Sequence, residues 1–173
     1  MKTIAIIGAI AGSVALQSSL LGLRVGGNLA INLVLIAVVY LALSYGPVTG
    51  MLAGMVGGLA QDTIAGGIIG IGGLCKTLIG FLVGVLGSQF NLSTTIPRMV
   101  MFIAATFVHE LLFEALHALV GWRPFAPHLS TTLVQALVNS LVGVIVFAVG
   151  EWGPEAAQRR KMNSRASLSR RRF

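Results

Sequence analysis

The sequence predicts an all-α, polytopic membrane protein, a compact bundle of about six transmembrane helices. Of its 173 residues, 55% are apolar and 10% are charged, and the mean hydropathy is +0.90. Soluble domains usually contain about a quarter charged residues, so this chain has too few charges to cover a surface that faces water. A wholly disordered chain is excluded as well, because low charge and high apolar content favour collapse.

The apolar runs define the individual spans. A helix needs about 20 apolar residues to cross about 30 Å of hydrocarbon. By this measure the candidate spans are 4–21, 29–45, 48 to about 60–64, 74–87, 99–120 and 133–149. The glycine-rich segment 61–73 could be re-entrant or partly unwound, provided that protein shields its backbone from lipid. Five spans plus a hairpin is the alternative count.

The first apolar run resembles a secretory signal, because Met1-Lys2-Thr3 precedes it. However, the run 4–21 is long for a signal core, and a second span follows after a short loop. We therefore expect a retained first transmembrane helix.

The distribution of lysine and arginine predicts the orientation. Six spans place both termini on one side, together with Lys2, Arg98 and the seven basic residues of the carboxyl-terminal tail. The opposite side would then hold Arg24, Lys76 and Arg123. Cytoplasmic loops carry the excess of basic residues, so we expect both termini in the cytoplasm.

The chain is expected to comprise a transmembrane domain, 1–152, and a basic cytoplasmic tail, 153–173, that is disordered. No acidic residue occurs in 158–173. Such a tail can lie on anionic lipid headgroups and fix the topology, or it can bind an acidic partner. It lacks the features expected for recognition of nucleic acid.

Glycines recur every four residues in the middle of the chain, as they do at Gly8 and Gly12 in the first span. The third span contains Gly46, Gly50, Gly54 and Gly58, and the fourth contains Gly80 and Gly84. Small residues at this spacing let another helix approach closely in lipid. The partner could be a helix of the same chain or a helix of another membrane protein.

The ends of the second span carry turn and polar residues. Pro47 follows Gly46 and suits the first turn of a helix, which predicts a tight turn between the second and third spans. Asn28 and Asn32 lie toward the outer end, where an amide can bond to a neighbouring helix.

The fifth span contains the densest set of ionisable residues: His109, Glu110, Glu114 and His117. Glu110, Glu114 and His117 have the spacing i, i+4 and i+7 and share one helix face. Two carboxylates one turn apart repel, so at least one should be protonated or bonded to a neighbour. They could pair within the bundle, or contact a partner or a pocket.

No catalytic or metal-binding pattern is found. A di-iron site would need a second Glu-x-x-His and further glutamates on other helices, and Phe113 replaces the second histidine of a zinc-protease motif. Neither a Gly-x-Ser-x-Gly turn nor a phosphate-binding loop is present. We therefore expect a non-enzymatic protein without a cofactor or a metal.

The middle of the chain carries a family resemblance. It contains Tyr40-Leu-Ala-Leu-Ser-Tyr-Gly-Pro-Val-Thr-Gly and then Gly58-Leu-Ala-Gln-Asp62, followed by a loop with glycines at 66–74. These segments resemble the rod-shape-determining MreD family, over about residues 28–90 and in layout elsewhere. Many members carry Pro-Asp where this chain has Ile31-Asn32, which keeps a polar amide and loses the charge.

The resemblance implies a non-enzymatic, multi-pass protein of the bacterial inner membrane that belongs to the cell-elongation machinery (the elongasome). Its implied partner is MreC, and through MreC a class B penicillin-binding transpeptidase, RodA and MreB, which links it to peptidoglycan synthesis and cell shape. The architecture also resembles the substrate-binding subunits of energy-coupling-factor transporters. That likeness supplies an alternative function, a membrane subunit that binds a small molecule.

These implications lead to a specific expectation for the scaffold. The glycine faces of the third and fourth helices would dock a helix of MreC, and Asp62 would face the outer side, near the partner. In the alternative, Glu110, Glu114 and His117 would line a ligand pocket.

Overall fold

Six helices account for most of the described chain. The computed structural model describes residues 2–19, 24–25, 28–29, 31–66, 68–90, 94–121, 124–125 and 128–151. Its helices are α1 (Lys2–Ser19), α2 (Leu33–Tyr45), α3 (Pro47–Ala65), α4 (Ile71–Gln89), α5 (Thr95–Gly121) and α6 (Leu129–Glu151). Two strands of two residues each, β1 (Arg24–Val25) and β2 (Asn28–Leu29), pair antiparallel between α1 and α2. The tail predicted at 153–173 lies outside the described residues.

All six apolar runs contribute a helix, but their lengths differ. Helices α4, α5 and α6 are each long and apolar enough to cross a membrane by themselves. Helix α2 and the Ile6–Ser19 part of α1 are apolar but shorter. The all-helical class is therefore confirmed, whereas a count of six spans stays a prediction.

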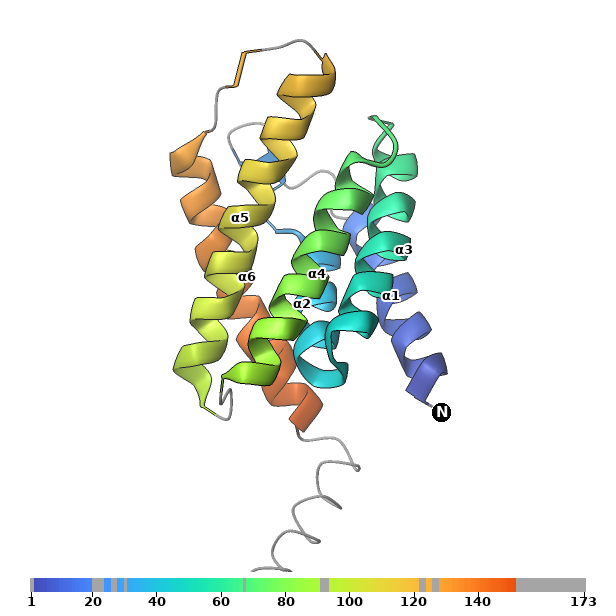
Figure 1. Cartoon of the computed structure of the whole chain (residues 1–173), viewed down its shortest axis with the longest axis vertical. Coiled ribbons are helices and arrows are strands. Elements are labelled where there is room, and N and C mark those ends of the chain that lie inside the picture. The colour runs from blue at the N-terminus through green and yellow to red at the C-terminus, as the bar shows by residue number, and fades with distance from the viewer. Residues whose placement is uncertain are drawn as a thin grey trace, which may run out of the picture.

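The helices run alternately up and down (Figure 1), so that α1 begins and α6 ends at the same end of the bundle. We call this end the terminal end, and we call the opposite end, which holds the α3–α4 turn, the distal end. The 27 residues of α5 make it the longest of the described helices, about 40 Å. Its last turns project past the other helices at the distal end (Figure 1).

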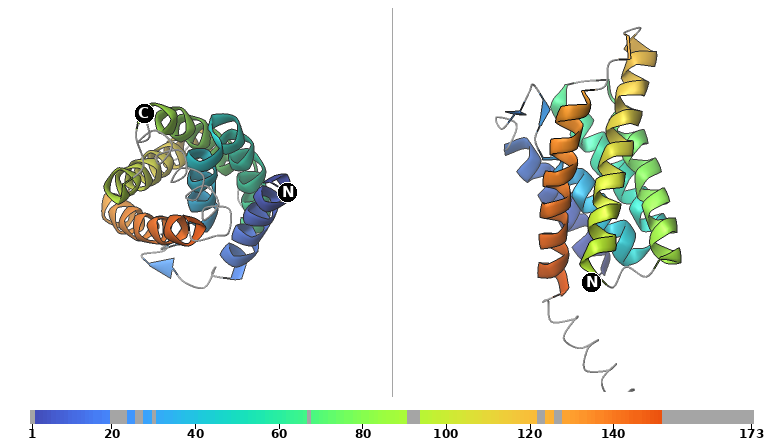
Figure 2. Two further views of the ribbon diagram at one scale, coloured as in Figure 1. Left: turned by 90° about the horizontal axis from the view of Figure 1, so that it is seen from below. Right: turned by 90° about the vertical axis from the view of Figure 1, so that its left-hand side faces the viewer.

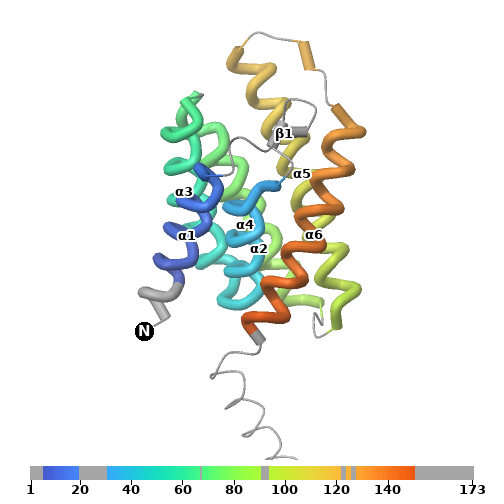
Figure 3. Tube along the Cα trace, turned by 180° about the vertical axis from the view of Figure 1, so that it is seen from behind, coloured from blue at the N-terminus to red at the C-terminus, as the bar shows by residue number. Residues whose placement is uncertain are grey.

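Helix α2 forms the centre of the bundle. Viewed along the axis (Figure 2), the other helices surround it, and it contacts each of them. From behind (Figure 3), α1 and α6 lie on either side of α2. Seven of its thirteen residues are buried, among them Leu35, Val38 and Leu41. A helix that is apolar on every face is stable only when protein or lipid surrounds it, which explains this position.

The α3–α4 connection lies within the glycine-rich segment 61–73. Within segment 61–73, α3 continues to Ala65 and α4 begins at Ile71, so the backbone is helical except at a short turn. Gly66 (φ 68°) and Gly70 (φ 105°) adopt left-handed conformations that favour glycine and permit this reversal. The segment is therefore a helical hairpin that is unwound at its turn, and whether it is re-entrant in the membrane stays a prediction.

The start of α2 lies later in the chain than we expected. The apolar run predicted a helix from 29, but Leu29 belongs to β2 and α2 begins at Leu33. Asn28 consequently lies in the short strand and not in a membrane helix. At the other end of α2, Gly46 (φ 94°) and Pro47 form the predicted tight turn into α3.

Candidate functional site

Buried polar side chains gather toward the distal half of the bundle, and the first group of them lies at the start of α2. This helix has 13 residues, about 20 Å, and is shorter than the hydrocarbon core. Its first N–H groups lack partners within the helix and must be satisfied by other groups. Gln17 Oε1 accepts from Leu33 N (2.6 Å), Asn32 Oδ1 from Leu35 N (3.1 Å), and Asn139 Oδ1 from Asn32 N (3.0 Å).

We call Gln17, Asn32 and Asn139 the amide cap. Asn139 of α6 is fully buried and also donates through Nδ2 to the Thr106 hydroxyl on α5 (3.3 Å). Gln17 of α1 donates through Nε2 to the Ile31 carbonyl (3.0 Å). The cap thus joins four helices around the otherwise unsatisfied end of α2. Asn32 is bonded to a neighbouring helix as predicted, but through its backbone N–H.

The second group contains the charged residues, and we call Lys76, His109, Glu110 and Gln135 the polar cluster. Lys76 of α4 is 2% exposed, and its Nζ lies 3.3 Å from Nε2 of His109 on α5. Nδ1 of His109 lies 3.1 Å from Oε1 of Glu110. Gln135 of α6 donates to the same oxygen (3.1 Å). The cluster therefore connects α4, α5 and α6.

Lys76 corrects the sequence-based charge distribution. We counted it with Arg24 and Arg123 among the basic residues of the outer side, but it lies in the second turn of α4 with its side chain inside the bundle. The acidic groups Asp62 and Glu110 are within electrostatic range of its amine. A charge at membrane depth is costly unless it is paired, and such residues commonly mark functional sites.

Asp62 lies in the last turns of α3, toward the distal end. Its side chain is buried, and Oδ2 accepts from Gly70 N (2.9 Å) and Gly73 N (3.1 Å) at the start of α4. A carboxylate at a helix N-terminus satisfies free N–H groups and interacts favourably with the helix dipole. Asp62 is therefore the cap of the α3–α4 hairpin, and its place near a partner on the outer side of the membrane stays a prediction.

The other residues predicted in the fifth span lie nearer the projecting end of α5. His117 is half-buried, and its Nδ1 donates to the Phe113 carbonyl (3.1 Å). Glu114 is half-buried as well, and none of the hydrogen bonds or ion pairs of the described residues reaches it. The structure thus brings His109 and Glu110 into the polar cluster and leaves Glu114 and His117 outside it.

The glycine stripe lies inside the chain. A Cβ atom at Gly54 would clash with the Lys76 carbonyl, and one at Gly58 would clash with Gly73. Equivalent contacts join Gly50 to Gly80 and Gly84 to Pro47, while Gly46 serves the α2–α3 turn. The glycine faces of α3 and α4 that we expected to dock a partner therefore cover each other. A partner could reach them only by separating the two helices.

Sequence reasoning did not identify five of the buried polar residues of these two groups, which are Gln17, Lys76, Thr106, Gln135 and Asn139. Single polar residues within apolar runs do not show which neighbour they face. One signal was present, because Gln135 and Asn139 are four residues apart and share a face of α6. In the part of the chain that the structure describes, no group of three His, Cys, Asp or Glu side chains is close enough to hold a metal ion.

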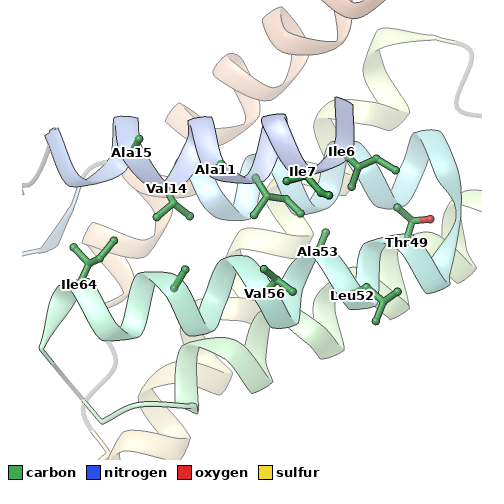
Figure 4. Close-up of a pocket in the computed structure, with 12 residues that line it drawn as sticks. Ile6, Ile7, Ala11, Val14, Ala15, Thr49, Leu52, Ala53, Val56 and Ile64 are labelled. Carbon is green, nitrogen blue, oxygen red and sulfur yellow. The ribbon is translucent and has the colours of Figure 1, made fainter. Parts of the chain in front are cut away.

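An apolar groove of about 680 Å³ runs between α1 and α3 (Figure 4). Its lining side chains come from both helices and are almost entirely aliphatic. They are Ile6, Ile7, Ile10, Ala11, Val14, Ala15, Thr49, Leu52, Ala53, Val56, Ala60 and Ile64. Of the exposed groove residues, Val56 is 53% and Leu52 50% accessible. The groove can hold an elongated apolar group and offers little to a polar ligand.

Comparison with protein families matches residues 6–150 to the rod shape-determining protein MreD, which covers well over half of the chain. Comparisons with curated proteins and with solved structures gave no match. The family and the three long apolar helices indicate an integral membrane protein with a role in determining rod shape. The chain belongs to the MreD family.

Proposed function

We propose that this protein is a non-enzymatic membrane scaffold of the bacterial cell-elongation machinery, which binds MreC and helps regulate peptidoglycan synthesis. Family membership supports a role in shape determination. The observation that carries the binding proposal is the apolar groove between α1 and α3. We therefore place the docking surface in this groove and not on the glycine stripe, because α3 and α4 bury the stripe against each other.

The length of the groove favours a transmembrane helix as its occupant. Its lining on α3 extends from Thr49 to Ile64, which corresponds to about 22 Å along the helix. One leaflet supplies about 15 Å of hydrocarbon, so a lipid chain from one side would leave part of the groove unfilled. A helix spans both leaflets, and the alanines of the groove permit close approach.

The surrounding assembly follows from the same proposal. The protein lies in the inner membrane with its terminal end in the cytoplasm, and MreC links it indirectly to a class B penicillin-binding transpeptidase, RodA and MreB. The basic residues after 157 bind anionic lipid at the cytoplasmic face. No nucleic acid takes part.

The groove is tested by blocking it with a larger side chain. Val56→Trp fills the groove, and Ile145→Trp on α6 is the matched control, because the two positions are 53% and 54% exposed. After purification from native membranes, Val56→Trp should recover at least about tenfold less MreC than the control, equivalent to about 1.4 kcal/mol of binding free energy. Equal recovery by the two folded variants would contradict docking in the groove.

The second candidate is a small-molecule-binding subunit of an energy-coupling-factor transporter. The polar cluster favours it, because Lys76 and Glu110 place both charges inside the bundle. In that case the purified protein would bring transporter ATPases with it instead of MreC, and a vitamin-like ligand would raise its melting temperature.

A further inference from the structure

Three titratable side chains form a continuous line inside the bundle. Lys76 Nζ lies 3.3 Å from His109 Nε2, and His109 Nδ1 lies 3.1 Å from Glu110 Oε1. Both ring nitrogens of His109 are therefore engaged, one on each side. Lys76 and His109 are 2% exposed, and the Glu110 side chain is 18% exposed.

Two protonation forms satisfy the same contacts. In the charged form, the Lys76 ammonium donates to Nε2 of His109, and Nδ1–H donates to the Glu110 carboxylate. In the neutral form, the Lys76 amine accepts from Nε2–H, and Nδ1 accepts from protonated Glu110. One proton passes from Lys76 to Nε2 while another passes from Nδ1 to Glu110. The ring stays neutral and changes its tautomer, and no proton is gained or lost.

Opposing effects act on the balance between these forms. Asp62 from α3 is within electrostatic range of Lys76, and Gln135 from α6 donates to Glu110, so both favour the charged form. Burial favours the neutral form, because a charged side chain inside a membrane protein is costly to desolvate. Cys75 from α4 is the other titratable group near Lys76.

We propose that Lys76, His109 and Glu110 form a proton-exchange switch, in which two coupled proton transfers across the His109 ring convert a charged pair into a neutral one. Hydration stabilises charged side chains, so water that reached the cluster would favour the charged form. By reciprocity, the charged form favours a hydrated and more open cluster. The projecting end of α5 is continuous with the helix that carries His109 and Glu110, so its displacement would act on the switch directly. The switch goes beyond the scaffold function and does not depend on which partner binds.

The tautomer of His109 is the direct test. Ring ¹⁵N NMR spectra of histidine-labelled, full-length protein in lipid nanodiscs distinguish Nδ1–H from Nε2–H. His128→Gln leaves only His109 and His117 in the spectrum. His117 is a reference in the same helix, because the Phe113 carbonyl requires it to donate through Nδ1. At alkaline pH, His109 should show both tautomers, the minor one at about 10% or more, and His117 only one.

A single tautomer at His109, or a ring protonated on both nitrogens, would overturn the switch. Lys76→Met removes the partner of Nε2 and should leave only the Nδ1–H tautomer, which donates to Glu110. Two tautomers in that variant would also overturn it, because exchange would then not require Lys76. If Lys76→Met does not fold, the spectrum with both side chains intact decides the question by itself.

Discussion

Lys76 on α4 is compensated by groups from the helices on either side of it. Asp62 lies within electrostatic range on α3, and Glu110 is linked to it through His109 on α5. When one member of a buried pair is removed, the other is left as an uncompensated charge, which costs more than the pair itself contributes. The two residues should therefore depend on each other.

We expect Lys76→Met to lower the free energy of unfolding by about 3 kcal/mol, because Asp62 and Glu110 lose their counter-charge. Adding Glu110→Gln should recover at least about 1 kcal/mol, since the amide can still bond to His109 and Gln135. The measurement is unfolding in mixed micelles with increasing dodecyl sulfate, followed by circular dichroism. Strict additivity of the two changes would show that the residues are not coupled.

Asp62→Ala should destabilise the α3–α4 hairpin by about 1–2 kcal/mol, because the N–H groups of Gly70 and Gly73 lose their acceptor. Asp62→Asn keeps one acceptor oxygen and should cost less. Thr63→Ala is the control, since the exposed Thr63 hydroxyl bonds only within its own helix. The same unfolding assay applies, and equal stability of Asp62→Ala and Thr63→Ala would argue against a capping role.

The identities of the residues predicted which ionisable side chains are unusual for a membrane span, but not which partners these side chains contact. His109 and Glu110 were recognised because ionisable groups in a span are costly. Lys76 was not, because it lies near the start of the expected span 74–87 and was therefore counted with the basic residues of the outer side. Asn32 and Asn139 are 107 positions apart, and only the packing of α2 against α6 brings them together.

At the scale of elements, the α3–α4 hairpin depends on backbone contact. Gly54 lies against the Lys76 carbonyl, and Gly80 lies against the Gly50 carbonyl. Rigid backbone atoms cannot move aside as a flexible side chain would, so even one methyl group must separate the two helices. The same spacing on α1 has no such role, because nothing lies within 4 Å of a Cβ at Gly8 or Gly12.

This contrast gives a matched pair of variants. Gly54→Ala should destabilise the protein by about 1–3 kcal/mol, because overpacking forces α3 and α4 apart. Gly12→Ala should be neutral or stabilise by up to about 1 kcal/mol, since alanine favours helix and open space surrounds this site. Unfolding midpoints of the two proteins check this, and similar destabilisation by both would refute the assigned packing.

The elements themselves were largely predictable, because each apolar run formed a helix. The extent of helix within the glycine-rich 61–73 segment could not be predicted, since glycine lowers helix propensity and only the contact with α4 shows why it is there. The start of α2 was placed four residues early, at 29, because Leu29 and Ile31 are apolar and continue the run. The amide cap sets the start of α2 after Asn32, and it requires groups from α1 and α6.

At the scale of the whole molecule, the polar and apolar features are separated in space. The polar cluster connects α4, α5 and α6, and the amide cap joins α1, α2, α5 and α6 near the start of α2. The groove lies between α1 and α3. The terminal end holds Arg98, which packs over the Phe147 ring at 4.7 Å. With Lys76 inside the bundle, Arg24 and Arg123 remain as the basic residues that the sequence assigns to the outer side, and the cytoplasmic orientation of the termini stays a prediction.

The arrangement of the helices could not be predicted from their composition. In lipid, apolar residues can face either the membrane or the protein, so hydropathy does not separate the two surfaces. Leu137 of α6 is 61% exposed, whereas Leu35 of α2 is 1% exposed. The groove results from the way α1 packs beside α3, and no motif in either helix indicates it.

The proposed scaffold function depends most on what occupies the groove, and site-specific photocrosslinking in living cells identifies that occupant most directly. A photoreactive residue is placed at Val56, in the groove, or at Ile145, which is equally exposed on α6. We predict an adduct with MreC from position 56 and none from position 145. Adducts with MreC from position 145 alone, or with a transporter ATPase in place of MreC, would contradict the proposed scaffold.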